Sequence, residues 1–121
     1  MDSGIYIAVF RLTRPRQMWI GCLGCCSLKS GVYLYVGSAQ RNLAARLARH
    51  QRKDKPLRWH IDYLSVEAEM LGAMIVPGAK SRECEVAGQL ARWFDLAIRR
   101  FGSSDCRCPG HLFYSNEFVK I

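Results

Sequence analysis

The sequence predicts an α+β domain with a small mixed, mainly antiparallel sheet flanked by helices. Short runs rich in β-branched and aromatic residues, at 5–12 and 32–36, are bounded by turn residues, which is typical of strands. Two later stretches, 43–52 and 86–101, carry apolar residues at the spacing of a helix face. The chain of 121 residues is long enough for one core, so we expect a single domain over residues 1–121.

The first third of the chain predicts three strands. Residues 5–12, IYIAVFRL, form the first and end in the turn at 13–16. Residues 17–20 are expected to be its partner strand, and 21–26 a turn or short connector. The run VYLYV at 32–36 is the third strand.

A basic helix follows the third strand. Asn42 suits the N-cap, and the helix should run to about Arg52. Leu43 and Leu47 lie four residues apart and form its apolar side. Another side gathers polar and basic residues at i, i+3, i+4 and i+7, namely Arg46, Arg49, His50 and Lys53.

The second half of the chain predicts two more strands, a helix and an edge strand. Residues 59–66 are expected to be a short strand, and 70–76 a further apolar stretch. The helix at 86–101 should end at Gly102 as its C-cap. The tail, 112–121, alternates enough to be an edge strand.

The net charge points to the kind of partner. The chain has 18 Lys and Arg against 10 Asp and Glu, a formal net charge of +8. Basic side chains release the counterions condensed on a phosphate backbone, so this excess suits a polyanion. We expect a nucleic acid partner, DNA with RNA as an open alternative, although charge alone also fits simple solubility.

The N-terminal residues and the cysteines predict the compartment. No basic segment followed by an apolar run opens the chain, and no apolar stretch approaches the roughly 20 residues of a bilayer span. We therefore expect a cytoplasmic protein with no membrane contact. Its six cysteines should then be free thiols, metal ligands or redox groups rather than a disulfide framework.

Two short motifs and the helix after them resemble the GIY-YIG nuclease superfamily. Gly4-Ile5-Tyr6 opens the first strand, Tyr35-Val36-Gly37-Ser38 closes the third, and Arg46 lies in the following helix. More narrowly, the chain is similar to the DUF123 branch, which occurs alone or fused to endonuclease III-type repair proteins. The matching pieces are GVYLYVGSA (31–39), RLARH (46–50), WHIDYL (59–64), ECEVA (83–87) and FGSSDCRCPGHLFY (101–114).

The resemblance implies a GIY-YIG-like fold and the activity of a DNA endonuclease. It also implies a role in DNA repair, with another repair protein as partner. It implies that Glu83 holds Mg²⁺ or Mn²⁺ and that Arg46 clamps a phosphate oxygen. Tyr6 and Tyr35 would line the site, with Tyr6 the better candidate to orient or deprotonate the attacking water. His50, one turn beyond Arg46, would contact the same phosphate or relay a proton.

Helical geometry favours Glu83 over Glu85 as the metal ligand. Glu83 lies three residues before Val86 and seven before Leu90, so it extends the buried stripe towards the sheet. Each member of the predicted site also has an ordinary structural interpretation: strand aromatics for the tyrosines, a solvated helix residue for the arginine, and a dipole partner for the glutamate.

Residues around the motifs form a predicted DNA-binding surface. We expect the DNA backbone to contact Ser38, Arg49, Lys53, Lys55 and Arg58. The same surface suits a rival hypothesis, a non-catalytic nucleic-acid-binding module of the same fold.

Two further clusters, one around His60 and one of cysteines, each have two possible roles that the sequence does not separate. As a strand, Trp59-His60-Ile61-Asp62 would place His60 beside Asp62, as an acid–base or metal contact or as a structural hydrogen-bonded pair. A structural Zn²⁺ could be held by Cys106, Cys108 and His111, completed by Cys84 or by Cys22 and Cys25. The alternative is a set of buried thiols that packs the second helix against the tail.

Overall fold

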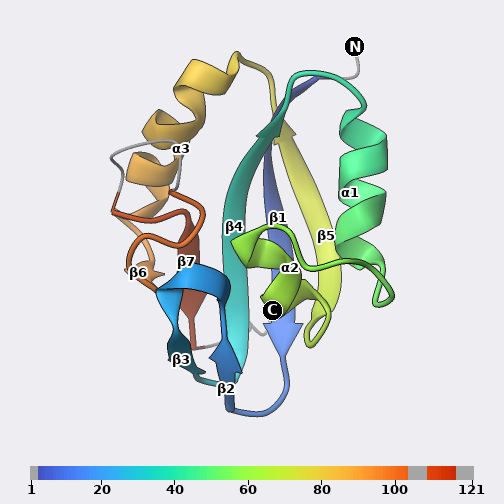
Figure 1. The fold of residues 1–121 in the computed structure, drawn as a ribbon. Coiled ribbons are helices and arrows are strands. Elements are labelled where there is room, and N and C mark those ends of the chain that lie inside the picture. Colours follow the sequence, from blue (N-terminus) through green and yellow to red (C-terminus); the bar gives the residue numbers. More distant parts are fainter. Residues whose placement is uncertain (1–2, 104–108, 117–121) are drawn as a thin grey trace.

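A five-stranded antiparallel sheet forms the centre of the molecule, with helices on both of its faces (Figure 1). The computed structural model describes residues 3–103 and 109–116. The strand order is β5-β1-β4-β7-β6. These strands are β1 (Gly4–Leu12), β4 (Gly31–Ala39), β5 (Glu69–Val76), β6 (Asp95–Leu96) and β7 (Leu112–Ser115). The predicted α+β class is confirmed, and every strand pair in the described residues is antiparallel.

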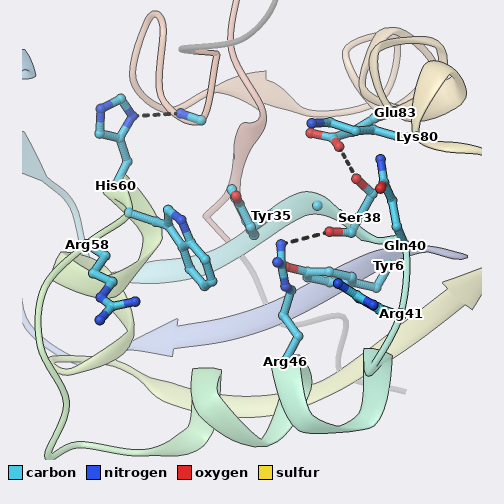
Figure 2. A pocket seen from close by; sticks show the side chains of 13 residues that line it. Tyr6, Tyr35, Ser38, Gln40, Arg41, Arg46, Arg58, His60, Lys80 and Glu83 are labelled. Carbon is cyan, nitrogen blue, oxygen red and sulfur yellow. Dashed lines mark hydrogen bonds between the residues drawn. The ribbon is translucent and has the colours of Figure 1, made fainter. Parts of the chain in front are cut away.

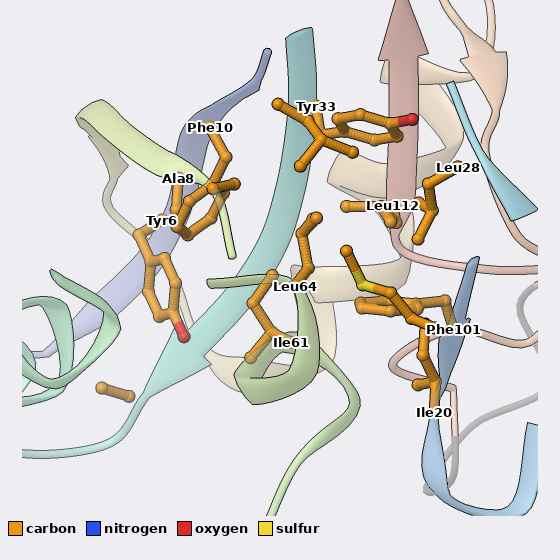
Figure 3. Close-up of a cluster of buried hydrophobic side chains, with 14 of the residues drawn as sticks. Tyr6, Ala8, Phe10, Ile20, Leu28, Tyr33, Ile61, Leu64, Phe101 and Leu112 are labelled. Carbon is orange, nitrogen blue, oxygen red and sulfur yellow. The ribbon is translucent and has the colours of Figure 1, made fainter. Parts of the chain in front are cut away.

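Strand β1 is buried on both faces, which is why its sequence is apolar almost throughout. Its even-numbered side chains, Tyr6 to Leu12, join the larger core cluster (Figure 3). Helices α1 (Leu43–Gln51) and α2 (His60–Ser65) contribute to that cluster. Ile5 and Ile7 face the opposite side, where they pack with α3 (Glu83–Leu90). The three helices therefore form two layers around the sheet.

The β1–β4 pairing brings the two halves of the predicted motif together. Tyr6 lies opposite Gly37, and Ala8 opposite Tyr35. The segment between the strands folds outside the main sheet as a hairpin of β2 (Arg16–Trp19) and β3 (Cys25–Leu28), joined by the 3-10 turn Gly21–Leu23. The 17–20 strand therefore exists, but the prediction that it pairs with the first strand is wrong. The expected connector at 21–26 is also partly a strand.

Helix α1 begins after Asn42, as predicted. The capping mechanism differs, because Asn42 is in the left-handed conformation (φ 57°) and its side chain makes no capping hydrogen bond. Its carbonyl oxygen accepts the first helical bond, from the Arg46 N–H at 3.0 Å. Leu43 is buried beneath the helix as expected.

The strand predicted over 59–66 is wrong, since these residues form α2. Short apolar runs fit either period, and here Ile61 and Leu64, three residues apart, are both fully buried. The buried Asp62 carboxylate decides the outcome. Its Oδ2 accepts the backbone N–H groups of Arg58 (2.8 Å) and Trp59 (2.9 Å), which caps the helix start.

The helix predicted over 86–101 is correct only in its first part. α3 ends at Leu90, and Asp95–Leu96 leaves the helix to pair with β7 as β6. Trp93, which lies within the predicted helix and would contribute to its apolar face, is 81% exposed. Gly102 is not a C-cap; it has φ +72° and lies far beyond the helix. A strand pairing with a distant segment is not visible in a local window, and it overrides the helical pattern.

The tail strand lies inside the sheet, so the prediction of an edge strand is wrong. β7 lies between β4 and β6 rather than at an edge. Residues 117–121 of the predicted strand lie outside the described residues.

Removing the Asp62 carboxylate should destabilise the fold strongly. Arg49 donates to its Oδ1 at 2.6 Å, and the Asp62 side chain is 0% exposed. We expect Asp62→Ala to lower the free energy of unfolding by about 3–5 kcal/mol, because it leaves a part-buried guanidinium without its partner. Urea unfolding measures this. Asp54→Ala, in the exposed loop after α1, is the control and should change it by less than about 0.5 kcal/mol. Equal effects of the two variants would contradict the assignment.

Candidate functional site

One polar cavity of about 440 Å³ opens where β1 and β4 meet the starts of α2 and α3 (Figure 2). We call it the basic pocket. It is lined by Tyr6, Tyr35, Gly37, Ser38, Gln40, Arg41, Arg46, Arg58, Trp59, His60, Lys80, Glu83 and Gly102. Seven predicted site residues are therefore brought together from five segments that are distant in sequence: Tyr6, Tyr35, Ser38, Arg46, Arg58, His60 and Glu83.

Cations dominate the walls of the basic pocket. Arg41, Arg46, Arg58 and Lys80 face a single carboxylate, Glu83, among the lining residues. Like charges gathered in one concavity create a positive potential that attracts and orients anions. The pocket therefore suits an anionic ligand.

Tyr6 and His50 form a buried hydrogen-bonded pair at the floor of the pocket. The Tyr6 hydroxyl lies 2.7 Å from His50 Nε2, and both side chains are almost fully buried. Burial raises the pKa of the Tyr6 phenol above its usual value, and the charge and hydrogen bond of Arg46 only partly oppose this. Burial, with the charge of Lys55, lowers the pKa of His50 to about 4. At neutral pH His50 is therefore an uncharged imidazole.

His50 does not line the basic pocket itself. It is 0% exposed and contributes no lining atom, so its contact with the pocket runs through Tyr6. Of the two expectations for His50, the geometry supports proton relay rather than direct phosphate contact.

Gly37 leaves the space that the Tyr6 ring occupies. A Cβ at Gly37 would lie 2.5 Å from both Cζ and the hydroxyl of Tyr6, and 3.0 Å from Tyr35. The two tyrosine rings lie 6.3 Å apart between centroids, and Tyr35 packs edge-on against Phe101. The absence of a side chain at this position is therefore a packing requirement of the site.

Arg46 connects three parts of the pocket. Its guanidinium donates to the carbonyl oxygen of Ser38 at 2.9 Å (Figure 2) and lies 4.6 Å from the Trp59 ring centroid. Its charge also acts on the Tyr6 phenol, whose pKa it lowers against the effect of burial. A guanidinium has five N–H donors. Remaining donors can therefore serve an anion in the pocket.

Glu83 faces the pocket, whereas Glu85 faces solvent, as predicted. Ser38 Oγ donates to Glu83 Oε2 at 2.5 Å, and His111 Nδ1 lies 3.0 Å from Oε1. Burial raises the pKa of the Glu83 carboxyl, but the hydrogen bonds from His111 and Ser38 outweigh it and lower the pKa overall. Glu83 is therefore ionised at neutral pH. The Glu85 side chain is 56% exposed and pairs with Arg82.

The donor set of the pocket fits a hard divalent cation held by one carboxylate. No group of three or more His, Cys, Asp or Glu side chains converges on a metal position within the residues described. A carboxylate offers about four acceptor positions, and Ser38 and His111 occupy one on each oxygen of Glu83. Mg²⁺ commonly combines one carboxylate with waters and substrate phosphate oxygens. Glu83 is the residue that would hold it.

His60 lies in the pocket but not beside Asp62. The strand alternation predicted for residues 59–62 is wrong, because α2 turns Asp62 into the core and His60 towards the pocket rim. His60 Nδ1 accepts the Gly102 N–H at 2.8 Å (Figure 2). That bond assigns the proton of a neutral His60 to Nε2. Burial lowers the pKa of His60.

Three predicted DNA contacts are turned inward. Arg49 pairs with Asp62 and stacks on Trp59. Lys53 Nζ donates to the carbonyl oxygens of Ser65 and Ala68. The Lys55 side chain is 0% exposed, and Nζ donates to Ser65 Oγ at 2.5 Å. These bonds connect the first helix, and the loop that follows it, to α2 and to the residues just before β5.

The predicted zinc site falls largely outside the described residues, where Cys106 and Cys108 lie. Cys84 is disulfide-bonded, so it is not a zinc ligand in this structure, and its Sγ lies 3.8 Å from His111 Nε2. A structural zinc site that does not include Cys84 stays a prediction.

Cys84 is in a disulfide, among six cysteines that were expected to be free thiols, metal ligands or redox groups rather than a disulfide framework. A disulfide depends on which thiols the fold brings together, and chain spacing does not reveal that. Cys22, Cys25 and Cys26 are free thiols, as expected.

Sequence reasoning missed four contributors to the pocket walls: Gln40, Arg41, Trp59 and Lys80 had no assigned role there. Gln40 and Arg41 directly follow β4, and Lys80 precedes α3 by three positions. The sequence did contain a signal for these residues. Polar residues directly after a motif strand, or directly before the helix that carries Glu83, can be expected to line the same site.

The fold and the pocket define an α+β protein with a basic, tyrosine-lined site suited to an anionic ligand. The chain belongs to the family described as Domain of unknown function DUF123, whose model matches residues 5–121. The narrower of the two resemblances is therefore confirmed. Comparison with curated proteins and with solved structures finds no match. No helix in the described part of the chain is long and apolar enough to cross a membrane.

A methyl group at Gly37 should disturb the Tyr6–His50 pair. Because the Tyr6 ring is 1% exposed, it cannot yield without shifting its neighbours. We expect Gly37→Ala to lower the free energy of unfolding by about 1–3 kcal/mol in thermal or urea unfolding. Gly72→Ala is the matched control on β5, since a Cβ there meets nothing within 4 Å. A Gly37→Ala protein as stable as the control would refute the close packing.

His50 should make stability depend on pH. The unfolded chain binds a proton at His50 below pH 6.5, whereas the folded chain does so only near pH 4. The contribution is complete above about pH 6.5 and is lost as the pH falls towards 4, by on the order of 3 kcal/mol. Urea unfolding at a series of pH values measures it. His50→Gln should flatten the curve in this window, with a residual slope from His60; an unchanged slope would exclude His50 as the source.

Proposed function

We propose that this DUF123 protein is a metal-dependent DNA endonuclease of the GIY-YIG type that hydrolyses phosphodiester bonds. The observation that carries the proposal is the convergence of Tyr6, Tyr35, Arg46 and Glu83 in one basic pocket. These residues come from separate segments, and they are the ones that the family resemblance implies for the reaction. Phosphodiester hydrolysis needs an activated water, stabilisation of charge on the phosphate and help for the leaving oxygen.

Phosphate binding is the part that the charges support most directly. Arg46 lies above Tyr6 with donors to spare, and Arg41 and Lys80 line the same walls. Arginine forks match phosphate oxygens, so these side chains would hold the reacting group and stabilise its negative charge. Phosphate contacts carry no base identity, so we expect low sequence specificity.

Proton removal from the attacking water would use Tyr6 and His50. The raised pKa of Tyr6 makes its phenol reluctant to ionise alone. His50 Nε2, uncharged at neutral pH and 2.7 Å away, can take the phenolic proton as Tyr6 accepts one from water. Tyr6 is thus the proposed base and His50 its proton acceptor.

Glu83 is the proposed ligand for Mg²⁺ or Mn²⁺. Such a cation supplies charge neutralisation at the phosphate and acidifies a bound water. Ser38 and His111 hold the Glu83 carboxylate in its ionised form and fix its direction. The resemblance to domains fused to endonuclease III-type proteins favours a role in DNA repair or processing, with another repair protein as partner.

The test compares two glutamates on one helix. Labelled duplex, branched and single-stranded DNA are incubated with Mg²⁺, with Mn²⁺ and with chelator. We expect cutting that needs the metal, and a loss of about 10²-fold or more in Glu83→Gln, Arg46→Ala and Tyr6→Phe. Glu85→Gln, whose side chain is solvent-exposed, should cut at the wild-type rate.

The rival binding module predicts a different result. In that case the DNA stays intact with every metal, and the protein binds it in a salt-sensitive manner. Intact DNA with every metal, together with binding that persists in chelator and is unchanged in Glu83→Gln, would reject the enzyme and favour a non-catalytic domain.

A further inference from the structure

Trp59 is the exposed aromatic side chain among the residues that line the basic pocket. Its relative exposure is 38%, whereas the other large aromatic at the floor, Tyr6, is 1% exposed. The remaining walls are mostly polar or charged. The part of the indole that is still exposed is apolar surface among charged groups, and a planar ligand group could cover it.

The indole packs against two guanidinium groups although it is 38% exposed. The Trp59 backbone N–H donates to Asp62 Oδ2 at 2.9 Å. The guanidinium carbons of Arg46 and Arg49 lie 4.6 and 4.5 Å from the ring centroid. Arg49 is itself fixed by its 2.6 Å bond to the buried Asp62. The ring is therefore positioned before any ligand arrives, which reduces the entropy lost when a planar group stacks on it.

One arginine joins this ring to the proposed phosphate position. Arg46 contacts the Trp59 ring, the Ser38 carbonyl oxygen and Tyr6 at the same time. A nucleotide whose phosphate lies against Arg46 therefore has its base within reach of the indole. In a continuous duplex that base is paired and stacked between its neighbours. Its face could reach the indole only if the base were first unstacked.

We propose that Trp59 is a stacking platform for an unpaired nucleobase adjoining the phosphate that Arg46 holds. The inference rests on the proposed function only in placing a phosphate in the basic pocket. Aromatic platforms beside basic grooves bind single strands with little sequence preference, because every base has a π-face. The preferred ligand is thus a strand with unpaired nucleotides rather than a continuous duplex.

Fluorescence of Trp59 alone reports the stack. The chain has 3 tryptophans, and Trp19 and Trp93 are 70% and 81% exposed, so Trp19→Phe with Trp93→Phe leaves Trp59 as the single reporter. This variant is titrated in chelator with a single-stranded DNA oligonucleotide, its RNA equivalent, and the duplex of the same sequence. We expect strong quenching by an unpaired strand and little by duplex; the strand that quenches at lower concentration, DNA or RNA, is the ligand class. Equal quenching by single strand and duplex would overturn the proposal.

Binding affinities of Trp59 variants show whether Trp59 stacks on a base or only supports the Arg46 side chain. Trp59→Leu should weaken single-strand binding by about tenfold and duplex binding much less, while Trp59→Phe, which keeps a stacking face, should restore most of the loss. Trp93→Leu is the matched control and should bind as the wild type does. Circular dichroism checks that each variant is folded.

The outcome is independent of cleavage. If single and duplex strands lose affinity equally in Trp59→Leu, Trp59 only supports Arg46 and the platform is rejected. If the strand preference and its loss are observed but no metal yields cutting, the platform stands and the nuclease proposal fails.

Discussion

The buried carboxylate of Asp62 holds together the two helices on the Tyr6 face of the sheet. Burying a charge is costly unless donors surround it, and here the backbone N–H groups of Arg58 and Trp59 and the Arg49 guanidinium do so. The same bonds start α2, attach it to α1, and fix Trp59 and His60 at the pocket rim. One structural carboxylate therefore positions a wall of the pocket without lining it.

The opposite wall depends on strand register. β1 and β4 pair so that Tyr6 lies opposite Gly37, and the Tyr6 ring occupies the space that a Cβ at position 37 would fill. The Tyr6 hydroxyl then contacts His50, which lies in the helix that follows β4. A slip of one residue would turn Tyr6 to the α3 face of the sheet. Tyr6 also belongs to the main core cluster, so packing and the proposed chemistry constrain the same side chain.

The charge distribution sets the pocket apart from the rest of the fold. Elsewhere three exposed arginines pair with glutamates: Arg11 with Glu69, Arg16 with Glu67, and Arg82 with Glu85. In the pocket four cations face one carboxylate, and that carboxylate is already hydrogen-bonded by Ser38 and His111. Such an excess opposes folding through repulsion and is relieved when an anion binds. Local arrangements that disfavour stability are expected where a ligand completes the structure.

The sequence by itself determined the sheet-forming runs, the first helix, the α+β class, and the family to which the chain belongs. The family resemblance selected Tyr6, Tyr35, Arg46 and Glu83, which the structure places in one pocket. Helical spacing by itself favoured Glu83 over the solvent-exposed Glu85. Only the tertiary structure decided that residues 60–65 are helical and that residues 95–96 join the sheet. Both outcomes depend on contacts with distant partners, Arg49 for the first and β7 for the second. The tertiary structure likewise turned Lys53 and Lys55 inward and brought Trp59, Arg41 and Lys80 into the pocket, since local periodicity contains no information about what a side chain meets across the fold.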